Sequence, residues 1–480
     1  MANLTRLRSI TPVLHLSVTT DRLALAIVFL LAVVTSQVVQ AQSFNVLHSF
    51  TGGNDGGNPS AGVVYRSGSF YGTTWAGGPQ NHGVIYQLKS DGSGWTLNAF
   101  YSLDGSDGQI PSAPVVFGPD GALYSTTEFG SGHGNIFKLT PMDCGMERCL
   151  WLESVLYTFQ GGTGDGSKPI GLIFDRAGNL YGTTSSGGAY GNGTVYKLSC
   201  VGDGCGSRDS DCQYADNFAP LCSVWTEGLL HSFDPSTGDG FVPYRSVLLF
   251  DNAGNLYGTT YFGGQYNAGT VFELTPSESG WTESVIYSFA GSADGRYPYS
   301  GLIMDQTGNL YGTTTDGGSG GGGTVFKLSP SDGGWTYSVL YSLTGSIGDS
   351  CGPAWALTMD AVGNLYDTTG CDGAYGFGNV FKLTKTGGSW RYTSLYDFTG
   401  GNDGSIPISG VTFDASGNLY GTTYYGGIHN AGVVWEIMPE ERVFRPERTH
   451  GPVVCLARDC SQGGMDLDQG IDLAHHDRNK

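Results

Sequence analysis

The sequence predicts an all-β protein, a seven-bladed β-propeller with four antiparallel strands in each blade. The first observation is a phrase, NLYGTT or a close variant, that occurs seven times at successive spacings of 53, 57, 76, 54, 55 and 54 residues. Such a period is typical of a repeated supersecondary unit. The second observation is the strand pattern inside each unit, and the third is a displaced strand before the first unit. The tyrosines of the seven phrases are Tyr71, Tyr124, Tyr181, Tyr257, Tyr311, Tyr366 and Tyr420.

Each unit is interpreted as four strands. In the third unit, an apolar run at 170–175 leads through a turn at 176–178 into a strand at 179–184, and a Gly-rich stretch precedes a strand at 193–198. Val, Tyr, Phe and Thr alternating with polar residues, with Gly, Asp, Asn and Ser between the runs, are strand and hairpin signals. Four such strands repeated radially form a propeller blade. An open β-solenoid is the alternative.

A displaced strand favours the closed ring. A fourth-strand motif follows six of the units, beginning at Trp95, Trp151, Trp225, Trp281, Trp335 and Trp390. The seventh copy, FNVLHSF at 44–50, precedes the first unit, whereas the last unit stops at 433–437 without one. We therefore expect the N-terminal strand 44–50 to complete the last blade, which leaves no open sheet edge.

The domain organisation follows from these boundaries. Residues 1–41 are expected to be a signal peptide, because three arginines precede the apolar run 23–34 and Val39-Gln40-Ala41 resembles a cleavage site. A membrane anchor is the alternative, but 12 apolar residues are fewer than the roughly 20 that span a bilayer. Residues 42–438 form the propeller, with an inserted loop at 199–223, and 439–480 are expected to be a disordered tail. We predict an extracellular or cell-surface protein without a transmembrane segment in the mature chain; the periplasm is an alternative.

The charge excludes one class of partner. The formal charge of −20 becomes −22 when residues 1–41, with three Arg and one Asp, are removed. An acidic surface repels phosphate backbones, so we expect no nucleic-acid partner. Cations, neutral glycans and basic peptides remain compatible with this charge, and we expect a monomer.

The cysteines favour an oxidising compartment. Cys144 and Cys149 share an inserted hairpin. Cys351 and Cys371 flank the first two strands of blade 6, which would bring them to one end of the blade, so a disulfide between them is predicted. Four further candidates share the loop 199–223 and allow three pairings: Cys200, Cys205, Cys212 and Cys222. Zinc is the competing interpretation for these four, although their spacing lacks paired C-x-x-C knuckles.

An aspartate followed four residues later by proline occurs before the first strand of every unit. The aspartates are Asp55, Asp107, Asp165, Asp239, Asp294, Asp349 and Asp403. Blade topology places these loops on one face, where seven carboxylates could surround the central opening. One interpretation is structural, with the carboxylate accepting hydrogen bonds from its own loop. The other is binding of a cation or sugar by a subset of them, calcium included.

Departures from the repeat on the same face are further binding candidates. The Gly-rich hairpins carry unlike aromatic residues, which stack well on sugar rings: Trp75, Phe129, Tyr261, Phe262, Tyr424 and Tyr425. The alternative is that most of them pack between blades. His82 and His133 occupy matching positions in blades 1 and 2 and could ligate a metal or transfer protons; solvent-exposed loop histidines are the alternative.

The sequence predicts neither a catalytic residue nor a cofactor. The segment 317–321, GGSGG, matches G-x-S-x-G formally. A nucleophile elbow requires a strand-to-helix turn, whereas this segment lies between two strands. Catalytic fingerprints for metalloproteases, P-loop enzymes and dinucleotide binding are not found in a suitable context.

The ordered set of submotifs carries a family resemblance. GNLYGTT, a GG pair, GTVF, GWTESVIYSF and a G-x-D-G loop ending in Pro recur in fixed order over about residues 44–438. This set resembles the GloVer tandem repeat of exported bacterial proteins described as "choice-of-anchor". The resemblance implies an extracellular or surface-attached protein and carries no established activity. The chain departs from it after Met438, where no hydrophobic anchor or sorting motif follows, so we expect a secreted protein.

Three functions compete. The first hypothesis is a non-enzymatic module that binds a glycan, a peptide or another surface component through the Asp and aromatic face. The alternative is a polysaccharide hydrolase or lyase that uses face carboxylates as acid and base, which requires an asymmetric pair at a defined separation. A purely structural envelope protein is the third.

Overall fold

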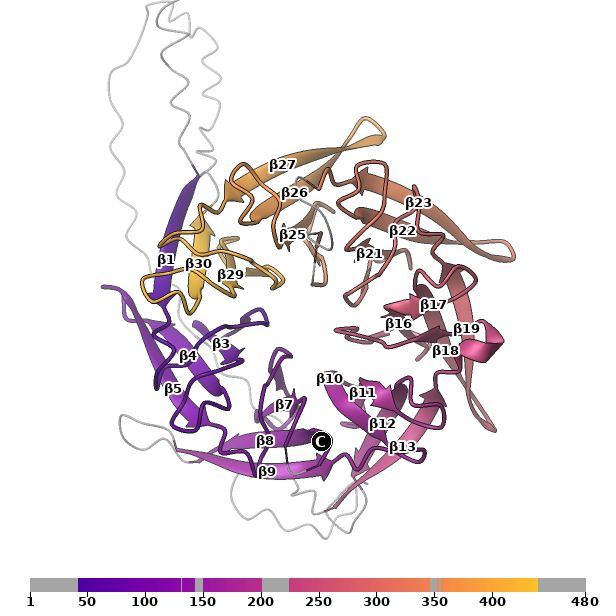
Figure 1. Cartoon of the computed structure of the whole chain (residues 1–480), viewed down its shortest axis with the longest axis horizontal. Helices are drawn as coiled ribbons and strands as arrows, with labels where there is room; N and C mark the ends of the chain where they lie inside the picture. Colours follow the sequence, from indigo (N-terminus) through magenta and orange to yellow (C-terminus); the bar gives the residue numbers. More distant parts are fainter. Residues whose placement is uncertain are drawn as a thin grey trace, which may run out of the picture. The chain divides into compact units, whose positions relative to one another are not determined.

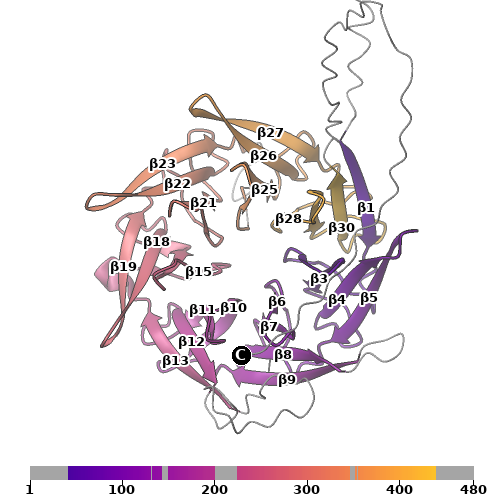
Figure 2. The same cartoon turned by 180° about the vertical axis from the view of Figure 1, so that it is seen from behind.

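The computed structural model describes residues 42–130, 132–142, 150–200, 224–345, 352–353 and 355–438. These residues form seven four-stranded antiparallel sheets arranged around a ring (Figures 1 and 2). The predicted seven-bladed propeller is therefore confirmed. In this described part of the chain, no helix is long and apolar enough to cross a membrane. The predicted signal peptide 1–41, the tail 439–480 and most of the inserted loop 199–223 lie outside the described residues.

Each blade runs from its innermost to its outermost strand. Blades 1 to 3 contain β2 (Val64–Arg66), β3 (Ser69–Thr74), β4 (Val84–Ser90) and β5 (Trp95–Ser102); β6 (Val116–Phe117), β7 (Leu123–Thr127), β8 (Asn135–Pro141) and β9 (Trp151–Thr158); and β10 (Gly166–Phe174), β11 (Leu180–Gly187), β12 (Thr194–Cys200) and β13 (Trp225–Ser232). Blade 4 contains β15 (Leu249–Phe250), β16 (Leu256–Thr260), β18 (Thr270–Ser277) and β19 (Gly280–Ser288), beside a small pair β14 (Gly240–Phe241) and β17 (Phe262–Gly263). A 3-10 turn, Pro235–Thr237, precedes this pair.

The last three blades repeat the pattern. Blades 5 and 6 contain β20 (Ile303–Met304), β21 (Leu310–Thr314), β22 (Thr324–Ser331) and β23 (Gly334–Ser342), and β24 (Thr358–Met359), β25 (Leu365–Thr369), β26 (Asn379–Thr386) and β27 (Ser389–Asp397). Blade 7 contains β28 (Thr412–Phe413), β29 (Leu419–Thr423), β30 (Val433–Met438) and, as its outermost strand, β1 (Ser43–Ser49). The N-terminal strand thus closes the ring as predicted.

The hydrophobic cores lie between blades. Seven clusters of buried side chains are present, one at each junction of neighbouring blades. At the junction of blades 4 and 5, Phe289 meets Phe326 with ring centroids 5.2 Å apart, and both side chains are fully buried. Each blade is therefore stabilised mainly by its neighbours, because burial of apolar surface is the dominant favourable term in folding.

The repeated phrase is explained by contacts within and between blades. In five of the seven phrases, the first threonine donates to a carbonyl of the next blade, as Thr259 does to Ser300 at 2.6 Å. The glycine before it is required because a Cβ at Gly258 would lie 2.4 Å from the ring of Phe272. Blade 6 departs from this rule, since a fully buried aspartate, Asp367, stands where the other phrases have Gly or Ser.

The outermost strand of every blade carries a β-bulge against the third strand. In blade 3, His231 pairs with Val195 and Leu229 with Tyr196, so Leu230 is the extra residue. A bulge re-aims side chains locally. Leu230 packs against the core between blades 3 and 4, while His231 contacts the loop that leads into blade 4.

In six of these inter-blade loops, the proline packs so closely against a glycine of the preceding blade that a larger residue would collide with it. A Cβ on Gly193, whose φ is +101°, would lie 2.4 Å from the carbonyl oxygen of Thr184 and 2.8 Å from Cδ of Pro243. The same glycine–proline contact recurs at five further junctions, at Gly83, Gly134, Gly269, Gly378 and Gly432. The hairpin of one blade and the inter-blade loop of the next are therefore packed as a unit.

Candidate functional site

The inter-blade aspartates lie between the outer strands of neighbouring blades. Asp107 accepts hydrogen bonds from the hydroxyl of Tyr101 on β5 at 2.5 Å and from the backbone N–H of Asp104 at 2.9 Å. The same pattern, a bond from its own loop and one from a Tyr or His of the preceding outer strand, holds at Asp55, Asp165, Asp239, Asp294 and Asp403. Asp349 lies outside the described residues. The six described carboxylates are therefore junction residues and do not surround the central opening.

A third residue distinguishes the junctions from one another. It lies on the outer strand of the following blade, two positions after the tryptophan that begins that strand; on β1 it is the equivalent position. In order from the junction of blades 7 and 1, the residues are Leu97, Glu153, Glu227, Glu283, Tyr337, Tyr392 and Phe44. Tyr337 stacks on Tyr287 with centroids 4.1 Å apart, and Phe44 stacks on Tyr396 at 3.7 Å. Three consecutive junctions thus carry a second carboxylate where three others carry an aromatic stack.

The second carboxylates are held in an unfavourable environment. Burial, followed by repulsion from Asp107 and Asp104, raises the pKa of Glu153 to about 7. Burial and Asp165 raise the pKa of Glu227 to about 7. In both glutamates, Oε1 is buried without a hydrogen-bond partner in the described part of the chain. These side chains hold a proton more tightly than ordinary glutamates.

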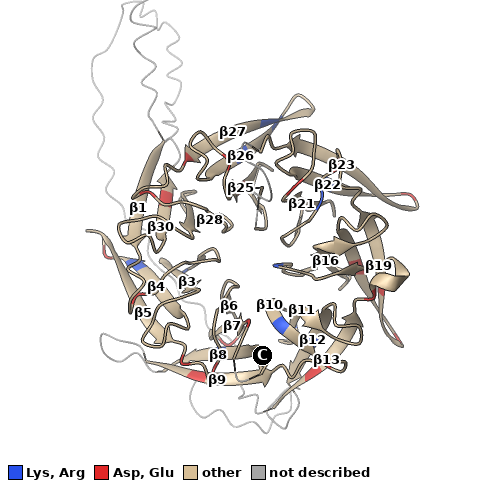
Figure 3. Cartoon of the chain, viewed as in Figure 1, with Lys and Arg blue, Asp and Glu red and all other residues tan. Residues whose placement is uncertain are grey.

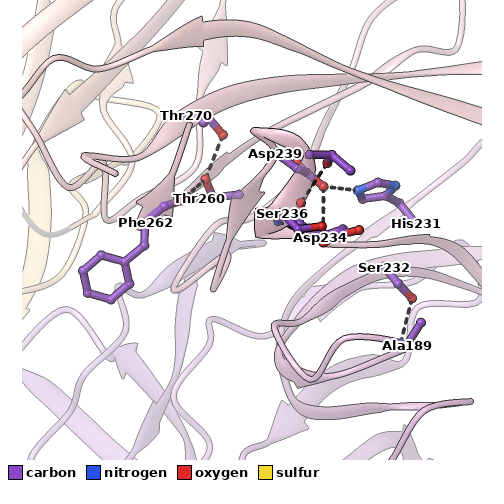
Figure 4. A network of polar contacts seen from close by, with 10 residues as sticks. Ala189, His231, Ser232, Asp234, Ser236, Asp239, Thr260, Phe262 and Thr270 are labelled. Atoms are coloured by element: carbon purple, nitrogen blue, oxygen red, sulfur yellow. Dashed lines mark hydrogen bonds and ion pairs between the residues drawn. The ribbon is translucent and has the colours of Figure 1, made fainter. Parts of the chain in front are cut away.

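The junction of blades 3 and 4 adds a histidine to its two carboxylates. His231 Nε2 lies 2.7 Å from Asp239 Oδ2, and one ligand atom each of His231, Asp239 and Glu283 lie within 4.8 Å of one another. Figure 4 shows the imidazole directed at Asp239, with Asp234, which caps the 3-10 turn, and Ser236 of that turn beside it. Of the residues described, only these three form a group of at least three His, Cys, Asp or Glu side chains that could hold a metal ion.

The predicted histidines His82 and His133 pack against glycines of the inter-blade loops. A Cβ on Gly105 would meet the ring of His82 at 2.8 Å, and one on Gly161 would meet the ring of His133 at 2.9 Å. Each imidazole therefore lies over the inter-blade loop that follows its own blade. Phe377 occupies the same place over Gly400 in blade 6, which shows that the position accepts an apolar ring.

Of the predicted disulfide cysteines, the structure describes Cys200 and Cys371. Cys200 and Cys371 are disulfide-bonded. The other candidates, Cys144, Cys149, Cys205, Cys212, Cys222 and Cys351, lie outside the described residues. The pairing of Cys351 with Cys371 stays a prediction.

Six residues immediately before the inter-blade prolines have a left-handed backbone. They are Asn58, Ile110, Lys168, Val242, Tyr297 and Ile406, with φ between 55° and 61°. Left-handed conformations are costly for β-branched residues such as Ile and Val. The backbone is repeated while the side chains differ, so these loops present a regular frame with variable chemistry on one face.

Blade 4 places an arginine across the central opening. Four residues, 244–247, separate Pro243 from buried Leu248, whereas three, 299–301, separate Pro298 from the equivalent Leu302, and the longer loop contains Arg245 with φ +52°. Nη1 of Arg245 donates to the carbonyl oxygens of Ser60 in the blade 1 loop at 3.1 Å and Ile408 in the blade 7 loop at 3.4 Å. The guanidinium therefore reaches from one side of the ring to the other.

Two aromatic rings lie beside this guanidinium. It lies 5.6 Å from the ring centroid of Tyr299 and 5.2 Å from that of Trp355. Tyr299 in turn contacts Tyr244 at 5.0 Å and Tyr261 at 5.6 Å. We call Arg245, Tyr244, Tyr261, Tyr299 and Trp355 the Arg245 cluster.

The predicted aromatic residues are distributed unequally around this cluster. Burial raises the pKa of Tyr424 to about 12, with Tyr425 and Tyr244 adding to the rise and Arg245 opposing it. Trp75, 40% exposed, contacts Tyr424 at 6.0 Å. Of the other predicted aromatics, Phe262 lies against Tyr261 at 4.6 Å and stacks on Phe241, Tyr425 lies against Tyr424, and Phe129 lies beneath the ammonium of Lys168. Tyr261 belongs to the Arg245 cluster, and Tyr424 and Trp75 lie next to it; a binding role for the aromatic face stays a prediction.

A cavity adjoins the cluster. Trp355 is one wall of a space of about 190 Å³ whose other walls include Val63 of blade 1, Pro114 of blade 2, Leu357 of blade 6 and Val411 of blade 7. Inner segments of these blades approach one another only around the central opening. The cavity therefore belongs to the central channel.

The electrostatic setting makes Arg245 unusual. Acidic residues are spread around the blades, and basic residues are few (Figure 3). Among the residues the structure describes, the four ion pairs all involve other cations, and Arg245 Nε is buried without a hydrogen-bond partner. Guanidinium groups bind carboxylates, and their donors also suit other oxygen acceptors.

Sequence reasoning missed Arg245, His231 and Glu283. Two signals were present: one extra residue after the blade 4 proline, and a histidine in WTEGLLHSF where WTESVIYSF has tyrosine. Both are departures from the repeat, and their importance depends on which side chains of neighbouring blades they face.

The solved structures that match this chain do so at low sequence identity. An ulvan lyase of a polysaccharide lyase family is 11% identical, with 82% of this chain and 95% of that chain covered and a TM-score of 0.44. A protein described as a gluconolactonase is 14% identical, with 82% and 91% covered and a TM-score of 0.37. A Thermus thermophilus protein described as an oxidoreductase (glucose dehydrogenase) is 18% identical, with 68% and 95% covered and a TM-score of 0.36. Similarity at this level says nothing about substrate or activity.

No curated protein matches the chain. The family model described as the Gloeobacter/Verrucomicrobia repeat matches residues 32–206 and 223–435. These ranges contain all seven NLYGTT phrases and both sides of the inserted loop, so the predicted GloVer resemblance is confirmed. The chain belongs to the Gloeobacter/Verrucomicrobia repeat family.

Proposed function

We propose that this propeller is a non-enzymatic module that binds an oligosaccharide at the Arg245 cluster. The observation that carries the proposal is the asymmetry of that cluster: one arginine, present only in the blade 4 loop, lies among four aromatic residues from three blades. A structural role in the repeat would recur in other blades. A single site for one ligand departs from the repeat in this way.

The chemistry of the cluster suits a sugar. Aromatic faces stack on the apolar face of a pyranose ring, and a few well-placed polar groups fix its orientation. Arg245 supplies donors for a hydroxyl or carboxylate oxygen. The net charge of −20 repels densely anionic polymers, so the favoured ligand is a neutral oligosaccharide or one with a single uronic acid.

A matched pair of oligosaccharides tests this proposal. Two β-linked tetrasaccharides that differ only by one uronic carboxylate are titrated into the full chain by calorimetry. We expect both to bind, the acidic one more tightly. Arg245→Gln should abolish the difference, whereas Arg66→Gln, which removes a guanidinium lying over Phe117 outside the cluster, should preserve it.

A second variant keeps the proposal testable if Arg245→Gln fails to fold. Trp75→Ala removes a ring that is 40% exposed, so the fold is expected to remain while affinity for both sugars decreases. Cleavage of the sugar during titration would favour the alternative hydrolase or lyase. If neither sugar binds, whether calcium is present or absent, the binding proposal is contradicted and a structural envelope protein is favoured.

We further propose that the protein works outside the cytoplasm. The basic and apolar pattern of residues 1–41 supports export, and the disulfide-bonded Cys200 and Cys371 suit an oxidising compartment. Fractionation of cells that express the full chain, with mass spectrometry of the mature N-terminus, tests this. Recovery of the uncleaved chain in the cytoplasm would contradict it.

A further inference from the structure

The junction of blades 3 and 4 contains an arrangement that the binding proposal does not use. His231 is on β13 of blade 3, Asp239 is in the inter-blade loop, and Glu283 is on β19 of blade 4. Their ligand atoms lie within 4.8 Å of one another, and the His231–Asp239 contact is 2.7 Å (Figure 4). Three different segments therefore converge on one point between two blades.

The carboxylates at this point are incompletely satisfied. The Asp239 side chain is only 5% exposed. Oδ2 accepts from His231 and from the N–H of Asp234, but Oδ1 has no hydrogen-bond partner among the described residues, and neither has the buried Oε1 of Glu283. Buried charges in proteins are normally paired or coordinated to a metal. One imidazole therefore faces one buried and one half-buried carboxylate, each with an oxygen that lacks a hydrogen-bond partner in the described part of the chain.

The equivalent junctions show that this combination is particular to one place. At the junction of blades 2 and 3, Asp165 and Glu227 meet a tyrosine, Tyr157, in place of His231. At the junction of blades 7 and 1, His48 contacts Asp55 at 3.0 Å, but the third position is Leu97. Among the described junctions, only that of blades 3 and 4 brings a histidine and both carboxylates together.

We propose that His231, Asp239 and Glu283 bind a divalent transition-metal ion of the Zn²⁺ type, which links blades 3 and 4. The imidazole decides the class, because Ca²⁺ and Mg²⁺ take oxygen ligands, whereas Zn²⁺ accepts one histidine with carboxylates. In a tetrahedral site with bonds of about 2.0–2.2 Å, the ligand atoms lie roughly 3.3–3.6 Å from one another. Donors that are 4.8 Å apart therefore approach by roughly 1.2–1.5 Å on metal binding, His231 Nε2 and Asp239 Oδ2 move apart from 2.7 Å, and water completes the coordination.

The repeat itself supplies the control variant. His231→Tyr gives this junction the residue types found with Asp165 and Glu227, so the blades are expected to fold while an imidazole ligand is lost. The full chain and this variant are freed of metal with a chelator and titrated with Zn²⁺ by calorimetry. His450, His475 and His476 remain identical in both proteins, so the difference between them reports only on the junction.

We expect the parent chain to bind one equivalent of Zn²⁺ more than His231→Tyr does, and its thermal midpoint to rise further with Zn²⁺. Equal stoichiometry and equal midpoint shifts would overturn the metal site and leave a simple His–Asp ion pair. Glu283→Gln, nearly the same shape, provides a second variant if His231→Tyr unfolds. Leu97→Glu supplies the missing ligand beside His48 and Asp55, and should add an equivalent. Because none of these residues belongs to the Arg245 cluster, the outcome is independent of sugar binding.

Discussion

Thr422 of the last blade donates a hydrogen bond of 3.0 Å to the carbonyl oxygen of Ala61 in the first blade. Close to this seam, the N–H of Phe50, just after β1, donates to Gly432 at 3.0 Å, and the Phe50 side chain is fully buried. The two ends of the folded chain are therefore joined by contacts of the same kind as those between consecutive blades.

This closure predicts equal costs at equivalent phenylalanines. Phe50→Ala should destabilise the protein by about 3–5 kcal/mol, as expected for a large buried ring. Phe289→Ala, the same position at the end of blade 4, should cost the same within about 1 kcal/mol, by urea denaturation. A much smaller loss for Phe50→Ala would mean that β1 is detached in solution.

The second carboxylates predict a pH dependence of stability. The pKa of Glu153 and of Glu227 is about 7 in the folded protein and about 4.3 in an unfolded chain. Their contribution is most favourable below the unfolded value, and it is lost as the pH rises through 7, since the unfolded chain then releases protons more readily. Between pH 5 and pH 8 the urea midpoint should fall, and less so in Glu153→Gln/Glu227→Gln. Glu278→Gln, on an exposed hairpin, is the control that should retain the full dependence.

The buried aspartate of blade 6 predicts a stabilising substitution. Burial raises the pKa of Asp367 well above its ordinary value, and Oδ2 has no partner in the described structure. Asp367→Gly restores the residue found at Gly258 and Gly312, and should stabilise the protein by roughly 1–3 kcal/mol at neutral pH. Gly312→Asp should do the opposite in blade 5. If Asp367→Gly lowers the thermal midpoint, the carboxyl has a partner or role that outweighs its burial.

Two glycines with similar φ angles allow the cost of backbone strain to be measured separately from the cost of a steric clash. Gly193 and Gly254 have φ of +101° and +92°, but nothing lies within 4 Å of a Cβ on Gly254, whereas one on Gly193 would meet Thr184 and Pro243. Gly254→Ala should cost only the left-handed strain of about 1–2 kcal/mol. Gly193→Ala should cost clearly more, because the next blade must move. Equal losses in thermal unfolding would contradict the proposed packing of hairpin against inter-blade loop.

The repeat made the architecture predictable, while the contacts between repeats were not. Seven blades and the closing strand followed from NLYGTT and the displaced FNVLHSF motif, because both are local patterns. The aspartates were expected around the opening, yet Asp107 faces Tyr101, since a bulge in β5 turns the outer strand toward the next loop. Sequence periodicity does not reveal such cross-blade facing. For the same reason Arg245 went unrecognised, as its acceptors Ser60 and Ile408 are 185 and 163 residues away.

The placement of each apolar core between two blades has a consequence for biogenesis. The first strand to leave the ribosome, β1, has as its partner β30, the last strand of the ring. Blade 7 cannot complete its sheet before β30 has been synthesised, and contacts so distant in sequence form slowly. The ring therefore reaches its native state only after synthesis has passed Met438, and a chain exported while unfolded would complete assembly beyond the membrane. A chain truncated before β30 would therefore expose an unpaired, aggregation-prone sheet edge and would not form a smaller functional propeller.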